Sequence, residues 1–260
     1  MSEGLDTLAN GIGKAIETVP ELYQDAFQPT VQETGKLIAR IPHAINAAFS
    51  GLDKWILNKE YSIEETKKLL AQKLENVEPE KIVEPEPYVA IPALQAISYS
   101  MNSDELRNLY ANLLAKSMNI DTKDMVHPSF VEIIKQMSPI DASIFKTIFL
   151  TRLRPLIDLS IVTKTGNLNH HIYNISWITS YEPTLIQISF DNLIRLGLIE
   201  IPFGQSYADD TGYDIIRNTD YYIKSKLQLE ARNLGTIHEE KQFIKCTALA
   251  NSFYNICVIN

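Results

Sequence analysis

The segment from residue 125 to residue 145 holds several side chains that hydrolases use for catalysis. His127 is followed by Ser129 and Glu132, and Asp141 lies nine residues further along the chain. A serine nucleophile needs a base within hydrogen-bond distance and a third group that orients the base. Nearness in sequence does not supply that geometry, and the chain has no G-x-S-x-G motif. A catalytic role is therefore the weaker interpretation of this segment.

The same residues are explained by the ends of two predicted helices. Ser138 precedes a proline and has Asp141 three residues after it, which is the pattern of a helix N-cap. Phe130 belongs to the apolar face of a preceding helix, and His127 closes the loop before that helix. We therefore interpret His127, Phe130, Ser138 and Asp141 as a joint between two parts of the protein.

Other groups of polar residues give weaker signals. His170 and His171 are neighbours in a β-rich run, where successive side chains point to opposite faces and cannot readily chelate one ion. The acidic residues of 209–214 are typical of a solvated loop. A hydrolase or nuclease that uses His127 or this loop stays as an alternative. The chain lacks the common glycine-rich phosphate-binding motifs, and we expect no cofactor and no metal.

A basic island lies near the N-terminus, between residues 35 and 59. It contains four Lys or Arg residues against one Asp, and its apolar residues recur at spacings of three and four. Such a helix is typical either of a bundle whose basic side chains reach solvent or of an anionic membrane surface. The candidate membrane or partner surface consists of Lys36, Arg40, Lys54 and Trp55.

Composition limits the partners and the compartment. The formal net charge of −8 disfavours a nucleic-acid partner, because phosphates repel an acidic chain. The two cysteines form no disulfide framework and fit a reducing cytosol. No stretch approaches the roughly 20 apolar residues that span a bilayer. We expect a cytoplasmic protein, with peripheral contact with the inner membrane as the alternative.

The order of elements predicts a mainly α fold with two domains. We expect a helical domain over residues 1–137, in which 78–91 is an extended connector and a helix begins at Pro92. We expect a winged-helix-like α+β domain over 138–260. The second domain combines β-rich runs at 156–164 and 170–178 with a helix that begins at Pro183 and is closed by Gly197.

The helix predicted at 183–196 would occupy the position of a DNA-reading helix in a winged-helix fold. It carries only one arginine, Arg195, and one aspartate, Asp191, among mostly apolar side chains. A reading helix normally presents Arg, Lys, Asn or Gln to bases and phosphates. This composition favours a protein partner and argues against nucleic acid.

Several phrases resemble a known family. The matching phrases are the P-x-L-x-A pattern at Pro92, "ELRNLYANLLA" and "HPSFVEIIKQMSP" followed by Asp141 and Ala142. They resemble the bacterial abortive-infection alpha family, with a core of similarity over roughly residues 55–150 that extends more loosely to the C-terminus. The resemblance implies a role in defence against phage, in which an infected cell stops growing or dies. It implies no catalytic residue.

Together these observations favour a non-enzymatic anti-phage protein that acts through protein–protein contacts. The first alternative is an effector that acts on membranes through the basic segment 35–59. The second alternative is the hydrolase or nuclease considered above. A homo-oligomer is compatible with each of these hypotheses.

Overall fold

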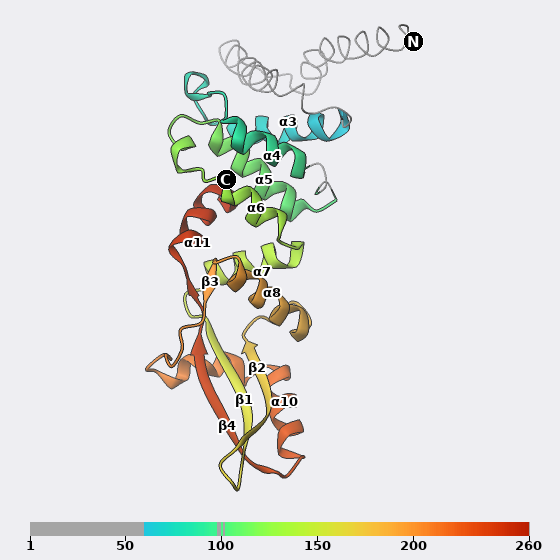
Figure 1. Ribbon diagram of the computed structural model, residues 1–260, viewed down its shortest axis with the longest axis vertical. Helices are drawn as coiled ribbons and strands as arrows, with labels where there is room; N and C mark the ends of the chain where they lie inside the picture. The colour runs from blue at the N-terminus through green and yellow to red at the C-terminus, as the bar shows by residue number, and fades with distance from the viewer. Residues whose placement is uncertain (1–59, 98–99, 101, 260) are drawn as a thin grey trace, which may run out of the picture.

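The computed structural model describes residues 60–97, 100 and 102–259, with the side chains described from residue 66 onward. The described part is elongated: helices gather at one end and a small antiparallel sheet lies at the other (Figure 1). The fold is mainly α with some β, as the sequence predicts.

In chain order, a helical part is followed by a part that mixes strands and helices, and the described chain ends in two short helical segments. They are α3 (Glu60–Leu74), η2 (Pro79–Lys81), α4 (Pro87–Ile97), α5 (Asp104–Ser117), η3 (Lys123–Met125), α6 (Ser129–Lys135), α7 (Pro139–Leu150), β1 (Pro155–Thr163), β2 (Leu168–Ser176), α8 (Pro183–Arg195), β3 (Ile199–Glu200), η4 (Asp210–Tyr213), α9 (Asp214–Arg217), α10 (Asp220–Glu230), β4 (Gly235–Phe243), β5 (Lys245–Cys246), α11 (Ala248–Phe253) and the π-helix η5 (Tyr254–Val258).

The start predicted for α4, at Pro92, is wrong. Helix α4 begins at Pro87, within the segment predicted as a connector, and Pro92 lies inside it. A proline inside a helix removes one hydrogen bond and strains the preceding turn. The apolar face of α4 is fully packed, and this tertiary burial outweighs the cost. The buried residues of the face are Val89, Ala90, Ala93, Leu94, Ala96 and Ile97.

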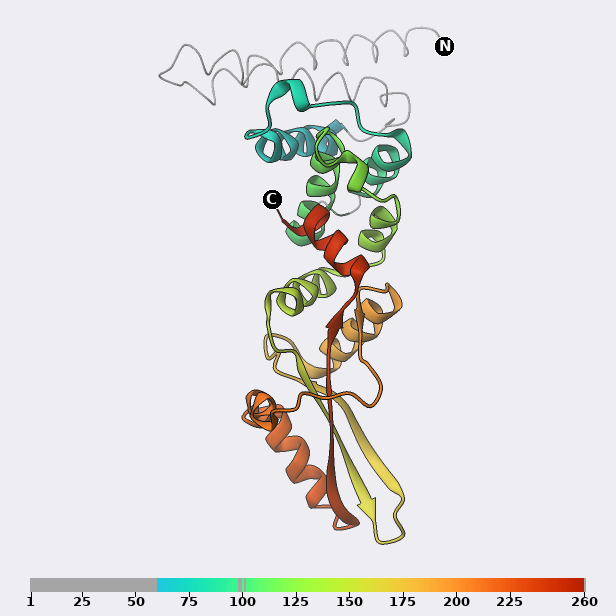
Figure 2. The same ribbon diagram turned by 90° about the vertical axis from the view of Figure 1, so that its left-hand side faces the viewer.

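The C-terminal helix returns to the helical end of the molecule, where η5 packs against α5 (Figures 1 and 2). Thr247 caps α11 by accepting a hydrogen bond from the backbone N–H of Ala250. The ring of Phe253 then meets Phe130 of α6 and Phe145 of α7 edge to face, each with ring centroids 5.6 Å apart. One buried core thus contains residues from both sides of position 137, and the division at 137/138 stays a prediction.

The three-stranded sheet has the order β2-β1-β4, with both pairs antiparallel. The register of β2 against β1 shifts at two places, where His170 and Asn174 adopt positive φ angles of 55° and 54°. Asp158 of β1 fixes one of them, because its Oδ1 accepts the backbone N–H of Asn174 at 2.7 Å. The carboxylate is desolvated, which raises the pKa of Asp158.

Helix α10 covers one face of this sheet (Figure 2). A second core fills the space between them and includes Ile157, Leu159 and Ile161 of β1 together with Tyr222 and Leu229 of α10. These β1 residues share one face because side chains alternate along a strand. The sheet end therefore has its own apolar core, apart from the helical core.

Helix α8 leads into the two-stranded sheet of β3 and β5. Its end follows the prediction: Gly197 has a φ of 71°, and the backbone N–H of Leu198 donates to the carbonyl of Leu193. Strand β3 then pairs antiparallel with β5, and residues 201–244 lie between them in the chain. This arrangement does not by itself confirm the winged-helix prediction.

Candidate functional site

The predicted joint begins with a capping box at the start of α7. Ser138 Oγ accepts the backbone N–H of Asp141 at 3.1 Å, and Asp141 Oδ2 accepts the backbone N–H of Ser138 at 2.7 Å. The spacing of these two residues predicts this cap, and the structure confirms it. Asp141 is only 4% exposed, so its carboxylate needs the partners that it has.

Helix α8 binds the turn between α6 and α7. The side-chain amide of Asn192 donates to Asp141 Oδ2 and to the backbone carbonyl of Gln136, each at 2.9 Å. Arg195 donates to the side-chain oxygen of Gln136 at 2.7 Å and to Asn192 Oδ1. No sequence pattern indicates these contacts, since α8 lies more than fifty positions from the turn that it binds.

Phe130 and His127 have different surroundings. Phe130 is buried against the C-terminal helix, whereas His127 is exposed. The His127 Nδ1 atom accepts the backbone N–H of Ser129 at 3.1 Å and lies 2.7 Å from Ser129 Oγ. These contacts satisfy the start of α6. Whether the four predicted residues act as an inter-domain joint stays a prediction.

The histidine–serine distance also meets one condition for a nucleophile and its base. The third group is not provided by the neighbouring acid, because Glu132 lies 3.8 Å from the ammonium of Lys135. In the described part of the chain, no carboxylate is bonded to the His127 ring. The structure therefore adds no support to the hydrolase alternative at this position.

The acidic segment 209–214 is tied to the sheet by Arg217. Its guanidinium contacts Asp210 and Asp214 at 3.0 Å and Glu239 of β4 at 2.9 Å. Hydrogen bonds from Arg217 and Lys241 lower the pKa of Asp210 to about 2. Burial and a hydrogen bond to Glu239 raise the pKa of Tyr222. The carboxylates are thus engaged in holding η4 and α9 against β4.

The two neighbouring histidines lie on the irregular strand β2. His170 Nδ1 is 2.9 Å from a guanidinium nitrogen of Arg232, and the His171 ring stacks on Tyr173 with centroids 5.4 Å apart. Among the described residues, no group of three or more His, Cys, Asp or Glu side chains suits a metal ion.

Two further sequence predictions concern membranes. Lys36, Arg40, Lys54 and Trp55 lie outside the described residues. Within the described part, we find no helix that combines the length and the apolar character needed to cross a membrane.

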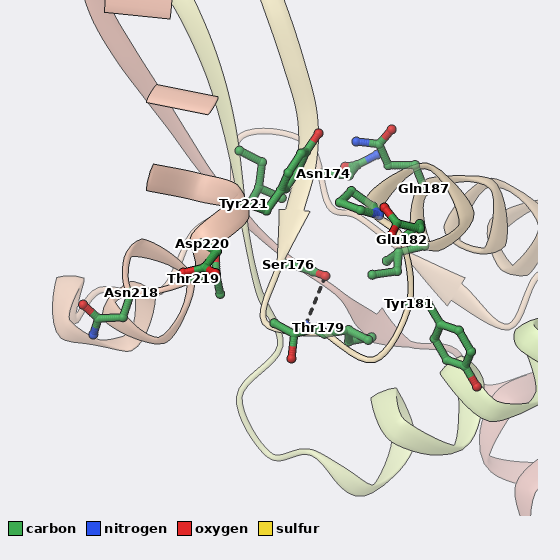
Figure 3. A pocket seen from close by; sticks show the side chains of 14 residues that line it. Asn174, Ser176, Thr179, Tyr181, Glu182, Gln187, Asn218, Thr219, Asp220 and Tyr221 are labelled. Atoms are coloured by element: carbon green, nitrogen blue, oxygen red, sulfur yellow. Dashed lines mark hydrogen bonds between the residues drawn. The ribbon is translucent and has the colours of Figure 1, made fainter. Parts of the chain in front are cut away.

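A cavity of about 440 Å³ lies where β2 ends and α8 and α10 begin. One wall comes from the segment between Asn174 and Gln187, and the other comes from residues 218–221. Figure 3 shows Asp220 and Tyr221 on the α10 side and Glu182 and Gln187 on the α8 side. The sequence indicated the start of α8 but not that the fold brings it beside α10.

The outward surface of α8, on the side away from this cavity, carries two exposed apolar side chains. Leu185 and Ile188 are 40% and 57% exposed, and their spacing of three places them side by side on the helix. The opposite face of α8 is buried through Ile186, Phe190 and Leu193. Helix α8 therefore carries apolar side chains on its outward surface as well as on its buried face.

Comparisons with known proteins give one family. The model of the family described as "Abortive infection alpha" matches residues 58–257. No curated protein matches the chain. A solved structure that matches is an uncharacterized protein from the hydrocarbon-degrading marine bacterium Alcanivorax borkumensis SK2. It is 10% identical, covers 54% of this chain and 96% of that chain, and has a TM-score of 0.32, a value too low to support an argument.

The family match spans well over half of the chain and includes the capping box at Ser138, the helix α8 and the C-terminal helix. It confirms the resemblance seen in the phrases around Pro92 and His127. It also covers the sheet, through residue 257, where the sequence predicted a looser similarity. This chain belongs to the abortive infection alpha family.

Proposed function

We propose that this protein acts in defence against phage without catalysis, by binding another protein through the outward surface of α8. Family membership supports the general role in abortive infection. The observation that carries the mechanism is the pair of exposed side chains Leu185 and Ile188. Burying the exposed part of each against a partner would contribute roughly 1 kcal/mol.

The polar groups of α8 support a protein partner over nucleic acid. Arg195 is bonded to Gln136 and Asn192 within the protein, so its guanidinium is not free to bind a phosphate. Asp191 is exposed on the same helix and would repel one. Nucleic-acid binding normally relies on several free Lys or Arg side chains, and α8 supplies none.

We also propose that α8, β3 and β5 form a winged-helix-like unit in which residues 201–244 enlarge the wing. The supporting features are the glycine-closed end of α8 and the antiparallel pairing of β3 with β5 directly after it. In this arrangement α8 occupies the position of the DNA-reading helix of a winged-helix fold, and its exposed apolar side chains contact a protein partner.

The first experiment tests the biological role. Cells that carry or lack the gene are challenged with a broad panel of phages, and plaque numbers and cell growth are measured. The proposal predicts fewer plaques for at least one phage when the gene is present. Equal plaque numbers across the panel would contradict it.

The second experiment tests the surface. A photo-crosslinking amino acid is placed at position 185, at position 188 or at the control position 223, an isoleucine on α10 that is similarly exposed. Irradiation of infected cells should give the same protein adduct from positions 185 and 188 and not from 223. Adducts of equal yield at all three positions would argue against a specific surface on α8.

A further inference from the structure

The segment 248–258 consists of α11 and the π-helix η5, and it packs on α5, the helix that also contacts α3, α4, α6 and α7. The ring of Tyr254 stacks on Phe149 of α7, with ring centroids 3.8 Å apart. The deeply buried side chains of the segment, each at most 2% exposed, are Ala250, Phe253, Ile256 and Cys257. Burial of apolar surface therefore holds the segment in place.

A polar contact between the segment and α5 leaves one atom without a partner. The side-chain amide of Asn112 donates to the carbonyl oxygen of Cys257 at 2.9 Å, near the end of the π-helix. Asn112 is only 3% exposed, and its Oδ1 atom is buried without a hydrogen-bond partner. A buried acceptor that has given up water without gaining a donor is destabilising. The closed contact therefore carries a penalty that disappears when water reaches Asn112.

The geometry of the segment also favours local opening. The backbone N–H of Ile259 donates to the carbonyl of Tyr254 at 3.1 Å, which is the five-residue spacing of a π-helix. Such turns are rare and are frequent at functional positions. A helical segment shorter than about 12 residues is marginal by itself in water. The order of residues 248–258 therefore depends on their contact with the helical end.

The beginning of the segment is attached to a different element. The hydroxyl of Thr247 donates to the carbonyl of Gly197 at 2.6 Å, and the backbone N–H of Thr247 donates to the carbonyl of Leu198 at 3.1 Å. These two bonds tie the base of α11 to the turn that ends α8, outside the contact with α5. The segment thus has a base that can stay in place when the part on α5 opens.

We propose that residues 248–258 form a latch that opens from α5 while the rest of the protein stays folded, and that Asn112 sets how readily it opens. Proteins open locally in cooperative units of this kind. Opening separates Phe253 from Phe130 and Phe145, the two rings that it meets edge to face. The latch therefore controls access to this part of the helical core. It goes beyond the proposed function and does not depend on a partner of α8.

The thiol of Cys257 reports the opening in the full-length protein. Both cysteines are free, and Cys257 is fully buried. Burial raises the pKa of this thiol, so it reacts only after the latch opens. Alkylation of Cys257 by iodoacetamide is followed by peptide mass spectrometry at increasing urea concentrations, and the rate of global unfolding is measured by circular dichroism under the same conditions.

The latch predicts two features of this reaction. Without urea, Cys257 should be alkylated at least about tenfold faster than global unfolding allows. At low urea the rate should change little, because opening of the latch exposes far less surface than unfolding of the whole protein. Alkylation only at the rate of global unfolding, with a steep dependence on urea from the start, would overturn the proposal.

A matched pair of variants tests the role of Asn112. Asn112→Asp removes the amide donor and puts a charge into the closed contact, whereas water solvates that charge in the open latch. Alkylation of Cys257 should therefore become at least about tenfold faster, with hydrogen exchange in α10 unchanged. The control Asn108→Asp makes the same change one turn earlier on α5, at an exposed position, and should react as the wild type does.

The contrary results are equally specific. An unchanged rate for Asn112→Asp, or an equal increase for Asn108→Asp, would refute the role of Asn112. Hydrogen exchange that accelerates equally in α10 and in residues 248–258 would show that the variant loosens the whole fold and would contradict a separate latch. If Asn112→Asp does not fold, the urea series on the wild type decides whether the latch exists.

Discussion

Removal of the Asp141 carboxylate should destabilise the protein more than removal of any exposed acid on the same helices. The carboxylate is nearly buried and accepts two hydrogen bonds, one from the backbone N–H of Ser138 and one from the side-chain amide of Asn192. The change Asp141→Ala leaves both donors without this acceptor.

The magnitude follows from the two donors. The Ser138 N–H belongs to a helix N-terminus, where loss of a cap costs about 1 kcal/mol. A buried donor that loses a charged acceptor costs about 1–3 kcal/mol, and Asn192 keeps its second bond to Gln136. We therefore expect a loss of about 2–3 kcal/mol in the free energy of unfolding, or roughly 5–10 °C in melting temperature.

The assay is urea denaturation followed by circular dichroism, with a double-mutant cycle of Asp141→Ala and Asn192→Ala. The cycle should give a coupling energy of about 1–2 kcal/mol between the two residues. The control Asp191→Ala, at an exposed position of α8, should stay within about 0.5 kcal/mol of the wild type. A cost for Asp141→Ala below about 1 kcal/mol, together with a coupling near zero, would refute the bridge between α7 and α8.

Three further predictions concern the mixed half of the fold. Gly235→Ala should cost about 2 kcal/mol or more, because a Cβ there would lie 1.9 Å from the carbonyl oxygen of Val162; thermal melting checks this, and a neutral result would mean that β1 and β4 are not so close. Gly197→Ala should cost about 1–2 kcal/mol, because its φ of 71° disfavours a side chain, whereas Gly212→Ala, with its nearest atom at 3.9 Å, should be neutral. Acidification should destabilise the wild type more than Asp210→Asn as pH falls from about 4 towards 2. The pKa of Asp210 is lowered from 3.8 to about 2 in the fold, so its stabilising contribution is present above the unfolded pKa and lost in that interval. Urea midpoints measured across these pH values check the last prediction, and parallel curves for the two proteins would contradict it.

The features that the sequence predicted are those that local physics determines. The cap at Ser138 and the glycine at position 197 each satisfy groups within a few residues. The β-rich run at 156–164 likewise marked β1 almost to the residue. These signals survive because no distant contact opposes them.

The features that the sequence missed depend on distant contacts. Helix α4 runs through Pro92 because its apolar face is buried by other helices, a gain that a local proline rule does not count. Asn192 and Arg195 look like ordinary polar residues of a surface helix until the fold brings Gln136 beside them. The cavity arises in the same way, since its two walls come from separate helices and neither carries a motif.

The central claim is that the outward surface of α8 mediates protection. Its most direct test is the efficiency of plating on cells that express Ile188→Glu, compared with wild type and with Ile223→Glu at equal protein level and equal melting temperature. Both positions are exposed isoleucines, 57% and 45%, so the variants differ in place rather than in chemistry. The account predicts that Ile188→Glu abolishes protection and that Ile223→Glu retains it; full protection by Ile188→Glu would contradict it.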